Sequence, residues 1–198
     1  DVYKRQIMNE AFRVLRTNLE FIVNKEQKSR IIILTSFVQG SGKTFLTINT
    51  AISLAVKGSK VLIIDGDLRR NAISKFIHFH KKGLSDYLAG EFNDIEKLFI
   101  SKIELDADSE YTDENGKRFL SDNLHVLPVG TIPPNPTELL LNARFGQLLA
   151  EVRTRYDYIF IDCPPVNIMA DSQIIGQYAD YTLSLIHISE PTRRTPIS

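Results

Sequence analysis

Apolar residues near the start of the chain recur at helical spacing, and short runs of β-branched residues follow them. The 3-4-3 spacing of apolar positions predicts an amphipathic helix over 9–23, with Phe12, Leu15, Leu19 and Ile22 on one face. Four apolar runs predict buried strands, at 31–35, 61–65, 124–127 and 158–162. Helical patterns predict further helices, over 43–56, 71–79, 83–88, 136–155 and 171–178. This alternation is typical of an α/β fold, a mostly parallel sheet with helices on both faces.

The composition excludes several classes of protein. The chain has 198 residues, which fits one domain, and its 24 basic and 24 acidic residues argue against a nucleic-acid partner. A single cysteine excludes a disulfide framework, and no apolar run approaches the roughly 20 residues that cross a bilayer. No signal peptide is visible, so we expect a cytosolic domain. The acidic, turn-rich segment 101–123 is interpreted as an inserted hairpin or loop.

Both ends of the chain carry the signature of translated adapter DNA. Residues 1–6 can be encoded by a DNA segment whose reverse complement translates as residues 183–188. Such an inverted repeat is typical of a transposon-end sequencing adapter, and 189–198 fit the rest of it. We therefore expect 1–6 and 183–198 to be adapter-derived and 7–182 to be the native domain, cut from a longer protein. Those 176 residues hold 20 basic and 22 acidic side chains, a net charge of −2.

The strongest chemical signal is a glycine-rich loop between the first predicted strand and the helix after it. Glycines let backbone amides turn toward a phosphate, and the helix N-terminus adds its positive dipole end. Lys43 would reach the β- and γ-phosphates of a nucleotide, and the Thr44 hydroxyl would bind Mg²⁺. Phe37 stands where the consensus has its first glycine, so the loop is a variant. We predict that ATP is bound by Gln39, Gly40, Ser41, Gly42, Lys43, Thr44 and Phe45.

Carboxylates follow two other predicted strands. Asp65 and Asp67 end one strand, and Asp162 ends another, directly before Cys163. Ligands of an open parallel sheet bind at the carboxyl ends of its strands, so the loop and these carboxylates should converge. Mg²⁺ prefers carboxylate oxygens and retained waters, which these residues can supply around a triphosphate. Cys163 has no histidine near it and is interpreted as a packing residue.

Two further motifs leave their role open. Glu10, Arg13 and Arg16 lie three apart on one ridge of the first helix, opposite its apolar stripe. Such a ridge is either a solvated surface or a contact with a partner subunit, and composition does not choose between them. The proline-rich segment 130–136 predicts a rigid turn before a well-capped helix.

Six motifs occur in order along the chain and together carry a family resemblance. They are Glu10-x-x-Arg13-x-x-Arg16, the Walker A loop ending at 44, the Walker A′ stretch 63–70, Gly83-Leu84-Ser85, the Pro-Pro-Asn-Pro segment 133–140, and the Walker B stretch 156–165. In these motifs the chain resembles the bacterial tyrosine kinases (BY-kinases), the cytosolic ATPase-like domains of capsule and exopolysaccharide co-polymerases. The resemblance implies a P-loop NTPase fold of the deviant Walker type. It also implies ATP-dependent autophosphorylation on tyrosines of a neighbouring subunit, which regulates polysaccharide polymerisation and export.

The resemblance also implies roles for individual residues. Lys43 and Thr44 would hold phosphates and Mg²⁺, and Asp67 and Asp162 would organise the metal. Asp65 is then the candidate for accepting the tyrosine proton, though Asp65 and Asp67 could exchange roles. Glu10, Arg13 and Arg16 would form the interface of a ring-shaped homo-oligomer. A membrane-anchored co-polymerase region, in the same or a partner chain, would place the domain at the cytoplasmic face of the inner membrane.

Some features depart from the family, and two other functions remain open. The family often has Glu where Ser41 stands, and its C-terminal tyrosine cluster is absent here. We expect the last strand or strands of the sheet, from near Tyr181 on, to be missing. A ParA/MinD-like positioning ATPase would share the fold but carries a signature lysine at the place of Val38. A third possibility is a non-catalytic, nucleotide-gated scaffold of an export complex.

Overall fold

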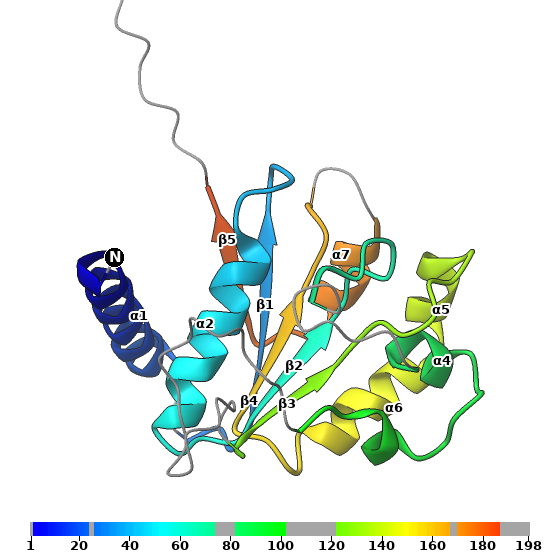
Figure 1. The fold of residues 1–198 in the computed structure, drawn as a ribbon. Coiled ribbons are helices and arrows are strands. Elements are labelled where there is room, and N and C mark those ends of the chain that lie inside the picture. Colours follow the sequence, from blue (N-terminus) through cyan, green and yellow to red (C-terminus); the bar gives the residue numbers. More distant parts are fainter. Residues whose placement is uncertain (1, 24–25, 74–81, 102–121, 167–169, 187–198) are drawn as a thin grey trace, which may run out of the picture.

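Five short strands form one sheet in which every pairing is parallel (Figure 1). The computed structural model describes residues 2–23, 26–73, 82–101, 122–166 and 170–186. Within these residues the strands are β1 (Arg30–Ser36), β2 (Val61–Asp65), β3 (Leu124–Leu127), β4 (Tyr158–Asp162) and β5 (Tyr181–Leu185). Their order across the sheet is β3-β2-β4-β1-β5, so the chain reverses its direction of winding, and ligands of such sheets bind at the carboxyl ends of the strands.

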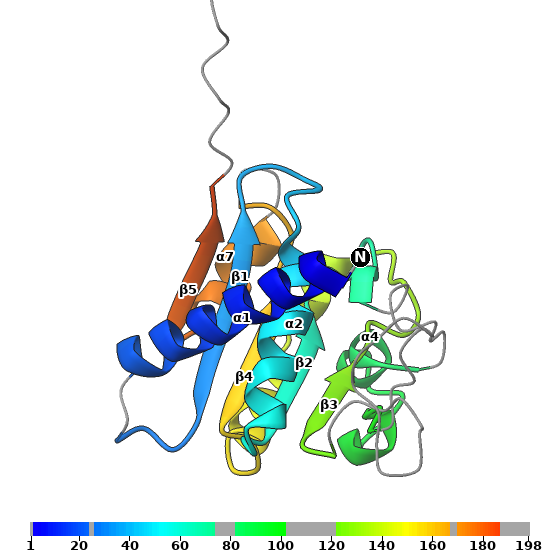
Figure 2. The ribbon, with the colours of Figure 1, turned by 60° about the vertical axis from the view of Figure 1, so that its left-hand side comes forward.

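Helices cover both faces of the sheet, as the pattern predicts. On one face lie α1 (Val2–Ile22) and α2 (Lys43–Val56), and Figure 2 shows α1 crossing over α2. The other face carries α4 (Leu84–Leu88), the 3₁₀ helix η1 (Ile95–Leu98), α6 (Ala143–Val152) and α7 (Ala170–Gly176), with α5 (Pro136–Leu141) beside α7. Because side chains alternate along a strand, each strand contributes to both cores.

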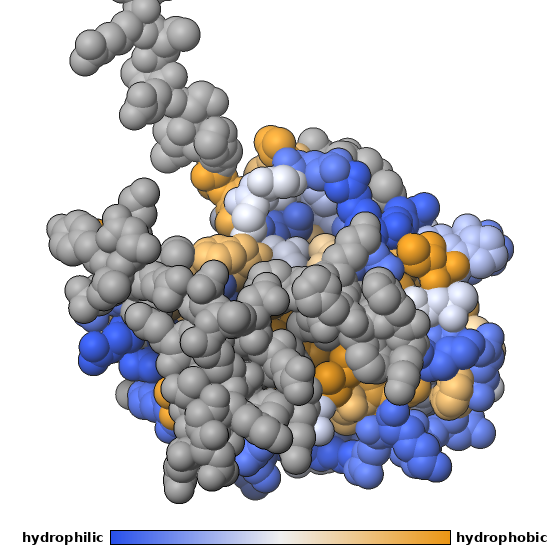
Figure 3. Space-filling model, viewed as in Figure 1, coloured by the Kyte–Doolittle hydropathy of each residue, from blue (hydrophilic) through white to orange (hydrophobic). Residues whose placement is uncertain are grey.

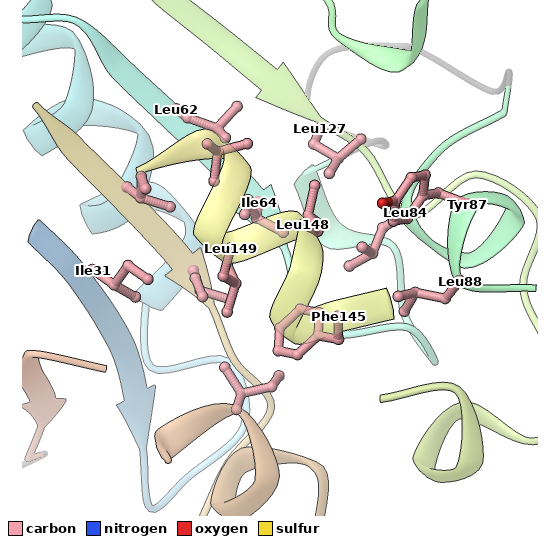
Figure 4. Close-up of a cluster of buried hydrophobic side chains, with 14 of the residues drawn as sticks. Ile31, Leu62, Ile64, Leu84, Tyr87, Leu88, Leu127, Phe145, Leu148 and Leu149 are labelled. Atoms are coloured by element: carbon pink, nitrogen blue, oxygen red, sulfur yellow. The ribbon is translucent and has the colours of Figure 1, made fainter. Parts of the chain in front are cut away.

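The core beneath α6 shows how these layers pack. Phe145, Leu148 and Leu149 of α6 are almost fully buried against strand residues such as Leu62 and Ile64 (Figure 4). Burying a leucine or phenylalanine side chain of this kind contributes about 1.5–3 kcal/mol. This cluster therefore fixes α6 on the sheet and, with it, the neighbouring helix α4.

One predicted helix is wrong and others shift at their ends. The helix expected over 136–155 is two helices, because the Asn142 side chain accepts a hydrogen bond from the Arg144 amide at 3.0 Å and starts α6 anew. The first helix is longer than expected and begins at Val2. Most of the predicted helix 71–79 and of the predicted insertion 101–123 lies outside the described residues.

The sheet does not end where the sequence suggested. A last strand from near Tyr181 was expected to be missing, but β5 pairs with β1 from Tyr181 to Leu185. Tyr181, Leu183 and Leu185 are half-buried and alternate with exposed residues, the pattern of a strand at the edge of a sheet. Residues 183–185 continue that alternation whatever their coding origin, so the strand forms. The adapter origin stays a prediction about the DNA. Among the described residues, no helix has the length and apolarity needed to cross a membrane.

Candidate active site

The candidate residues meet at the carboxyl ends of three adjacent strands. The glycine-rich loop follows β1, the Asp65–Asp67 segment follows β2, and Asp162 ends β4, which lies between β1 and β2. Asp65 and Asp162 are register partners, and the amide of Gly66 donates to the carbonyl of Asp162 at 3.0 Å. The sequence therefore predicted this convergence correctly.

The glycine-rich loop has the geometry of an anion cradle. Gly40 and Gly42 have φ values of 75° and 85°, and a Cβ at either position would meet open space. Helix α2 starts at Lys43 without a side-chain cap, so its first amides are available to a ligand. The Ser41 hydroxyl is buried and has no hydrogen-bond partner among the described residues. These observations fit a bound phosphate group.

A hydrogen bond joins this loop to the end of β4. The Thr44 hydroxyl donates to Oδ2 of Asp162 at 2.5 Å. Burial raises the pKa of Asp162 to about 6, against the opposing effects of the Thr44 hydrogen bond and the Lys43 charge, and the charge of Asp67 raises it further. The other carboxylate oxygen, Oδ1, is buried and accepts no hydrogen bond within the part of the chain described. A buried carboxylate of this kind is stabilised by a cation.

Asp65 and Asp67 have different environments. Asp65 is fully buried, and its Oδ2 accepts the amide of Ile73 at 3.1 Å. Asp67 is 7% exposed and carries a pKa raised by burial, partly offset by hydrogen bonds from backbone amides and by the charges of Arg70 and Lys43. The structure thus groups Asp67 with Lys43 and Asp162, whereas Asp65 holds the chain that follows β2.

Mg²⁺ and a nucleotide fit the chemistry of these groups. The hydroxyl of Thr44 and the carboxylates of Asp67 and Asp162 are the oxygen donors that Mg²⁺ takes, and the metal would complete its shell with water and phosphate oxygens. The loop amides and Lys43 supply the positive charge that phosphates need. Phe45, also predicted to bind the cofactor, turns its ring toward α1, where it lies edge-on to Phe12 at 5.9 Å between centroids.

Sequence reasoning missed a hydrogen-bond network beside Asp67. Arg69 contacts Oδ2 of the buried Asp171 at 3.1 Å, and its other nitrogen donates to the Thr137 hydroxyl at 3.2 Å. Thr137 in turn donates to Oδ1 of Asp171 at 2.6 Å. The network fastens the turn after β2 to α5 and α7. The sequence places Asp171 at the start of the helix predicted over 171–178 and Arg69 two residues after Asp67, but it does not show that the two side chains meet.

The three residues predicted to form an oligomer interface do not share one environment. Glu10 and Arg13 pair with each other at 3.3 Å on the exposed surface of α1. Arg16 instead is half-buried and donates to the carbonyl and hydroxyl oxygens of Ser53 in α2, at 3.0 and 3.3 Å. The expectation of one exposed ridge is therefore wrong at Arg16, which fastens α1 to α2.

Cys163 behaves as the sequence predicted. It is buried, and burial raises the pKa of its thiol, followed by the repulsive charges of Asp162 and other carboxylates. A thiol that does not ionise is a poor nucleophile. Cys163 therefore packs in the core beneath the site.

Comparison with known proteins agrees with this geometry. Residues 29–189 match the family described as AAA domain. The putative tyrosine-protein kinase CapB of Staphylococcus aureus is 34% identical over 174 residues, which cover 87% of this chain and 68% of CapB. The chain belongs to the bacterial tyrosine kinase family. The tyrosine-protein kinase wzc of Salmonella typhimurium is 35% identical over 175 residues, 88% of this chain, but the match spans only 22% of that relative.

Solved structures place this BY-kinase chain among P-loop NTPases. The kinase domain of Escherichia coli tyrosine kinase ETK superposes with a TM-score of 0.76 at 31% identity, over 93% of this chain and 65% of that one. The septum site-determining protein MinD of Pyrococcus horikoshii, solved with Mg-ADP, reaches 0.59 at 24% identity over 79% and 57% of the two chains. The second likeness shows the fold alone. Together they confirm the predicted fold class.

Proposed function

We propose that this chain is the catalytic domain of a protein tyrosine kinase that transfers the γ-phosphate of ATP to tyrosines of a neighbouring copy. The observation that carries the proposal is the 2.5 Å hydrogen bond between Thr44 and Asp162, which brings the phosphate loop and the Walker B carboxylate together. Lys43 and Asp67 complete the group, since both lie close enough to shift the pKa of Asp162 by their charges. The names of the BY-kinase relatives support phosphoryl transfer to tyrosine.

In this proposal each residue has a defined task. The loop amides and Lys43 bind and orient the phosphates, and Thr44 and Asp162 would hold Mg²⁺, which would neutralise charge on the phosphates. The tyrosine oxygen forms a bond to the γ-phosphorus while the bond to the bridging oxygen breaks and ADP leaves. We assign the phenolic proton to Asp67, because Asp65 is fully buried and occupied by the Ile73 amide.

Burial prevents three tyrosines of the chain from being phosphorylated by another copy. Tyr87, Tyr156 and Tyr158 are each no more than 7% exposed, so their hydroxyls do not reach the site of another copy. Burial also raises the pKa of Tyr156 to about 12, opposed by the charge of Arg155. The acceptor in a neighbouring copy is therefore not one of these three tyrosines.

The context of the domain is part of the proposal. The chain spans about a fifth of the Salmonella relative. We propose that it acts together with a membrane-anchored co-polymerase region, in the same or in a partner chain. The domain would then work at the cytoplasmic face of the inner membrane in capsule or exopolysaccharide polymerisation and export. The exposed Glu10–Arg13 pair supports a ring-shaped oligomer, because both side chains are accessible to charged groups of a neighbouring copy.

The test uses an added acceptor, because the buried tyrosines are inaccessible. The chain is incubated with Mg-ATP and a synthetic tyrosine-containing peptide, and phosphotyrosine on the peptide is measured together with ADP release. Wild type is expected to phosphorylate the peptide, and Lys43→Ala is expected to lose both signals. ADP release without phosphotyrosine would instead support a ParA/MinD-like ATPase or a nucleotide-gated scaffold.

A further inference from the structure

A small apolar pocket lies between α4 and the start of α5. Its volume is about 270 Å³, and it is lined by parts of α4, the residues just after it, the proline-rich loop and the first turn of α5. Pockets for cofactors and other small molecules measure about 300–1,000 Å³, so this one suits a single side chain better than a whole ligand. It is distinct from the phosphate loop, none of whose residues lines it.

The floor of the pocket is held in place by buried polar contacts. Oδ2 of Asp86, whose side chain is 1% exposed, accepts the amides of Gly83 at 2.8 Å and Thr131 at 3.1 Å. The Ser85 hydroxyl donates to the carbonyl of Val129 at 2.8 Å. Gly130 has a φ of 81°, and a Cβ there would lie 2.1 Å from Asp86 Oδ2. These contacts bind α4 tightly to the chain that leaves β3, so the pocket is preformed.

The walls of the pocket are apolar and its rim is acidic. Ile132, 52% exposed, and Leu139 face the same hollow as Ala89 and two prolines. Figure 3 shows hydrophobic surface among hydrophilic residues on this side of the molecule, near α5. Glu91 and Glu138 also line the pocket, and its lining contains no lysine or arginine among the residues that the structure describes. Lys82 pairs with Asp86 and Glu91, whereas Glu138 has no cationic partner among the ion pairs of the described residues. An apolar side chain next to a basic residue complements this surface.

The pocket lies on the same edge of the sheet as the candidate active site. β3 is the neighbour of β2, and the chain leaving each strand emerges at the carboxyl edge. Arg69, two residues after Asp67, donates to Thr137, whose neighbour Glu138 lines the pocket. A polypeptide that brings a tyrosine to Asp67 and Asp162 can therefore extend along this edge to the pocket.

We propose that the pocket binds an apolar side chain of the acceptor polypeptide, with an adjacent lysine or arginine at the acidic rim, and so docks the acceptor beside the site of phosphoryl transfer. The inference rests on the proposed tyrosine kinase function. It gives the proline-rich motif a role in substrate binding, beyond that of a turn. It also predicts that the kinase selects acceptors by sequence near the tyrosine.

Binding can be measured directly because the chain has no tryptophan. Ile132→Trp places a single tryptophan at the pocket, and Leu141→Trp places one at a residue that is 67% exposed in α5 but does not line the pocket. Three synthetic peptides serve as probes: one with a tyrosine near a leucine and two lysines, one with the leucine replaced by serine, and one with the lysines replaced by glutamate. We expect a saturable emission change for Ile132→Trp and none for Leu141→Trp. Ile132→Trp should bind the first peptide about tenfold more tightly than either of the other two.

Enzyme kinetics provide a second readout, with a variant that does not place a tryptophan side chain in the pocket. Ile132→Ser is expected to raise the KM for the leucine–lysine peptide about tenfold, with kcat and the KM for ATP unchanged. Leu141→Ser is the matched control and should leave all three constants as in wild type. Equal KM values for the three peptides, together with an unresponsive Ile132→Trp, would overturn the docking site while leaving the kinase intact. Absence of peptide phosphorylation would refute the kinase function, and the fluorescence titration would still decide on the pocket.

Discussion

Replacing Asp162 by asparagine should make the stability of the nucleotide-free protein less sensitive to pH. Burial raises the pKa of Asp162 from 3.8 in the unfolded chain to about 6 in the folded one. The folded state therefore binds the proton more tightly, and ionising Asp162 lowers stability as the pH rises from 3.8 to 6. The shift of about 2 pKa units corresponds to roughly 3 kcal/mol at pH 7. Asp162→Asn removes this cost because asparagine does not ionise.

Urea denaturation at several pH values measures the effect. The free energy of unfolding of Asp162→Asn, minus that of wild type, should grow by about 2 kcal/mol between pH 4 and pH 7 and then level off. The buried side-chain amide of the Asp162→Asn variant lacks an ideal hydrogen-bond partner. This adds a pH-independent amount to the difference in unfolding free energy but does not change its dependence on pH. A difference that stays flat over this range would refute the assigned environment of Asp162.

Asp86→Asn is the matched control, because Asp86 is equally buried but paired. Burial raises its pKa, but hydrogen bonds from Lys82, Thr131 and Gly83 outweigh burial and leave the pKa below 3.8. Its ionised form therefore stabilises the fold above pH 3.8, and that contribution is lost as the pH falls through the lower folded pKa. The difference between Asp86→Asn and wild type should change little between pH 4 and pH 7. Adding Mg-ATP should stabilise wild type much more than Asp162→Asn.

Three further predictions follow from contacts described above. Gly130→Ala should lower the free energy of unfolding by about 3 kcal/mol or more, because its Cβ overlaps Asp86. Gly90→Ala, whose φ is 83° but whose Cβ would meet open space, should lower it by only about 1–2 kcal/mol. Equal losses for the two variants would contradict the close packing at Gly130. Asp171→Asn should raise the Mg²⁺ concentration needed for half-maximal phosphorylation, whereas Thr137→Ser should leave it unchanged. An unchanged Mg²⁺ requirement in Asp171→Asn would limit the Arg69 network to a structural role. Arg16→Ala should lower the free energy of unfolding by about 1–2 kcal/mol because it loses its hydrogen bonds to Ser53. Arg13→Ala should leave the stability unchanged and lower the oligomer mass measured by light scattering. A lower oligomer mass for Arg16→Ala at unchanged stability would place Arg16 at the interface.

Local sequence predicted the sheet and the phosphate loop because their signals are strong and short. The β-branched runs ending at Ser36 and Asp162 are buried throughout, so periodicity and burial agree. The convergence of Thr44 with Asp162 followed from topology, since parallel strands end at one edge. In these parts of the chain, local pattern and tertiary packing favour the same structure.

The errors arise where a distant residue decides the outcome. Arg16 was expected on an exposed ridge of the first helix, but Ser53 of α2 offers it two hydrogen-bond acceptors. The helical pattern of 136–155 concealed a break at Asn142, whose side chain caps a new helix. Asp171 starts the helix predicted over 171–178, but its partners Arg69 and Thr137 are 102 and 34 residues away along the chain. Periodicity contains no information about such partners.

The central claim is phosphoryl transfer to tyrosine by the Lys43, Asp67 and Asp162 group, and tandem mass spectrometry tests it most directly. The chain is incubated with Mg-ATP and the leucine–lysine peptide, and phosphate is assigned to individual side chains. The account predicts phosphotyrosine on the peptide with wild type and none with Lys43→Met, a substitution of similar length without the charge. Phosphotyrosine at wild-type levels with Lys43→Met, or ADP release with no phosphotyrosine from wild type, would contradict it.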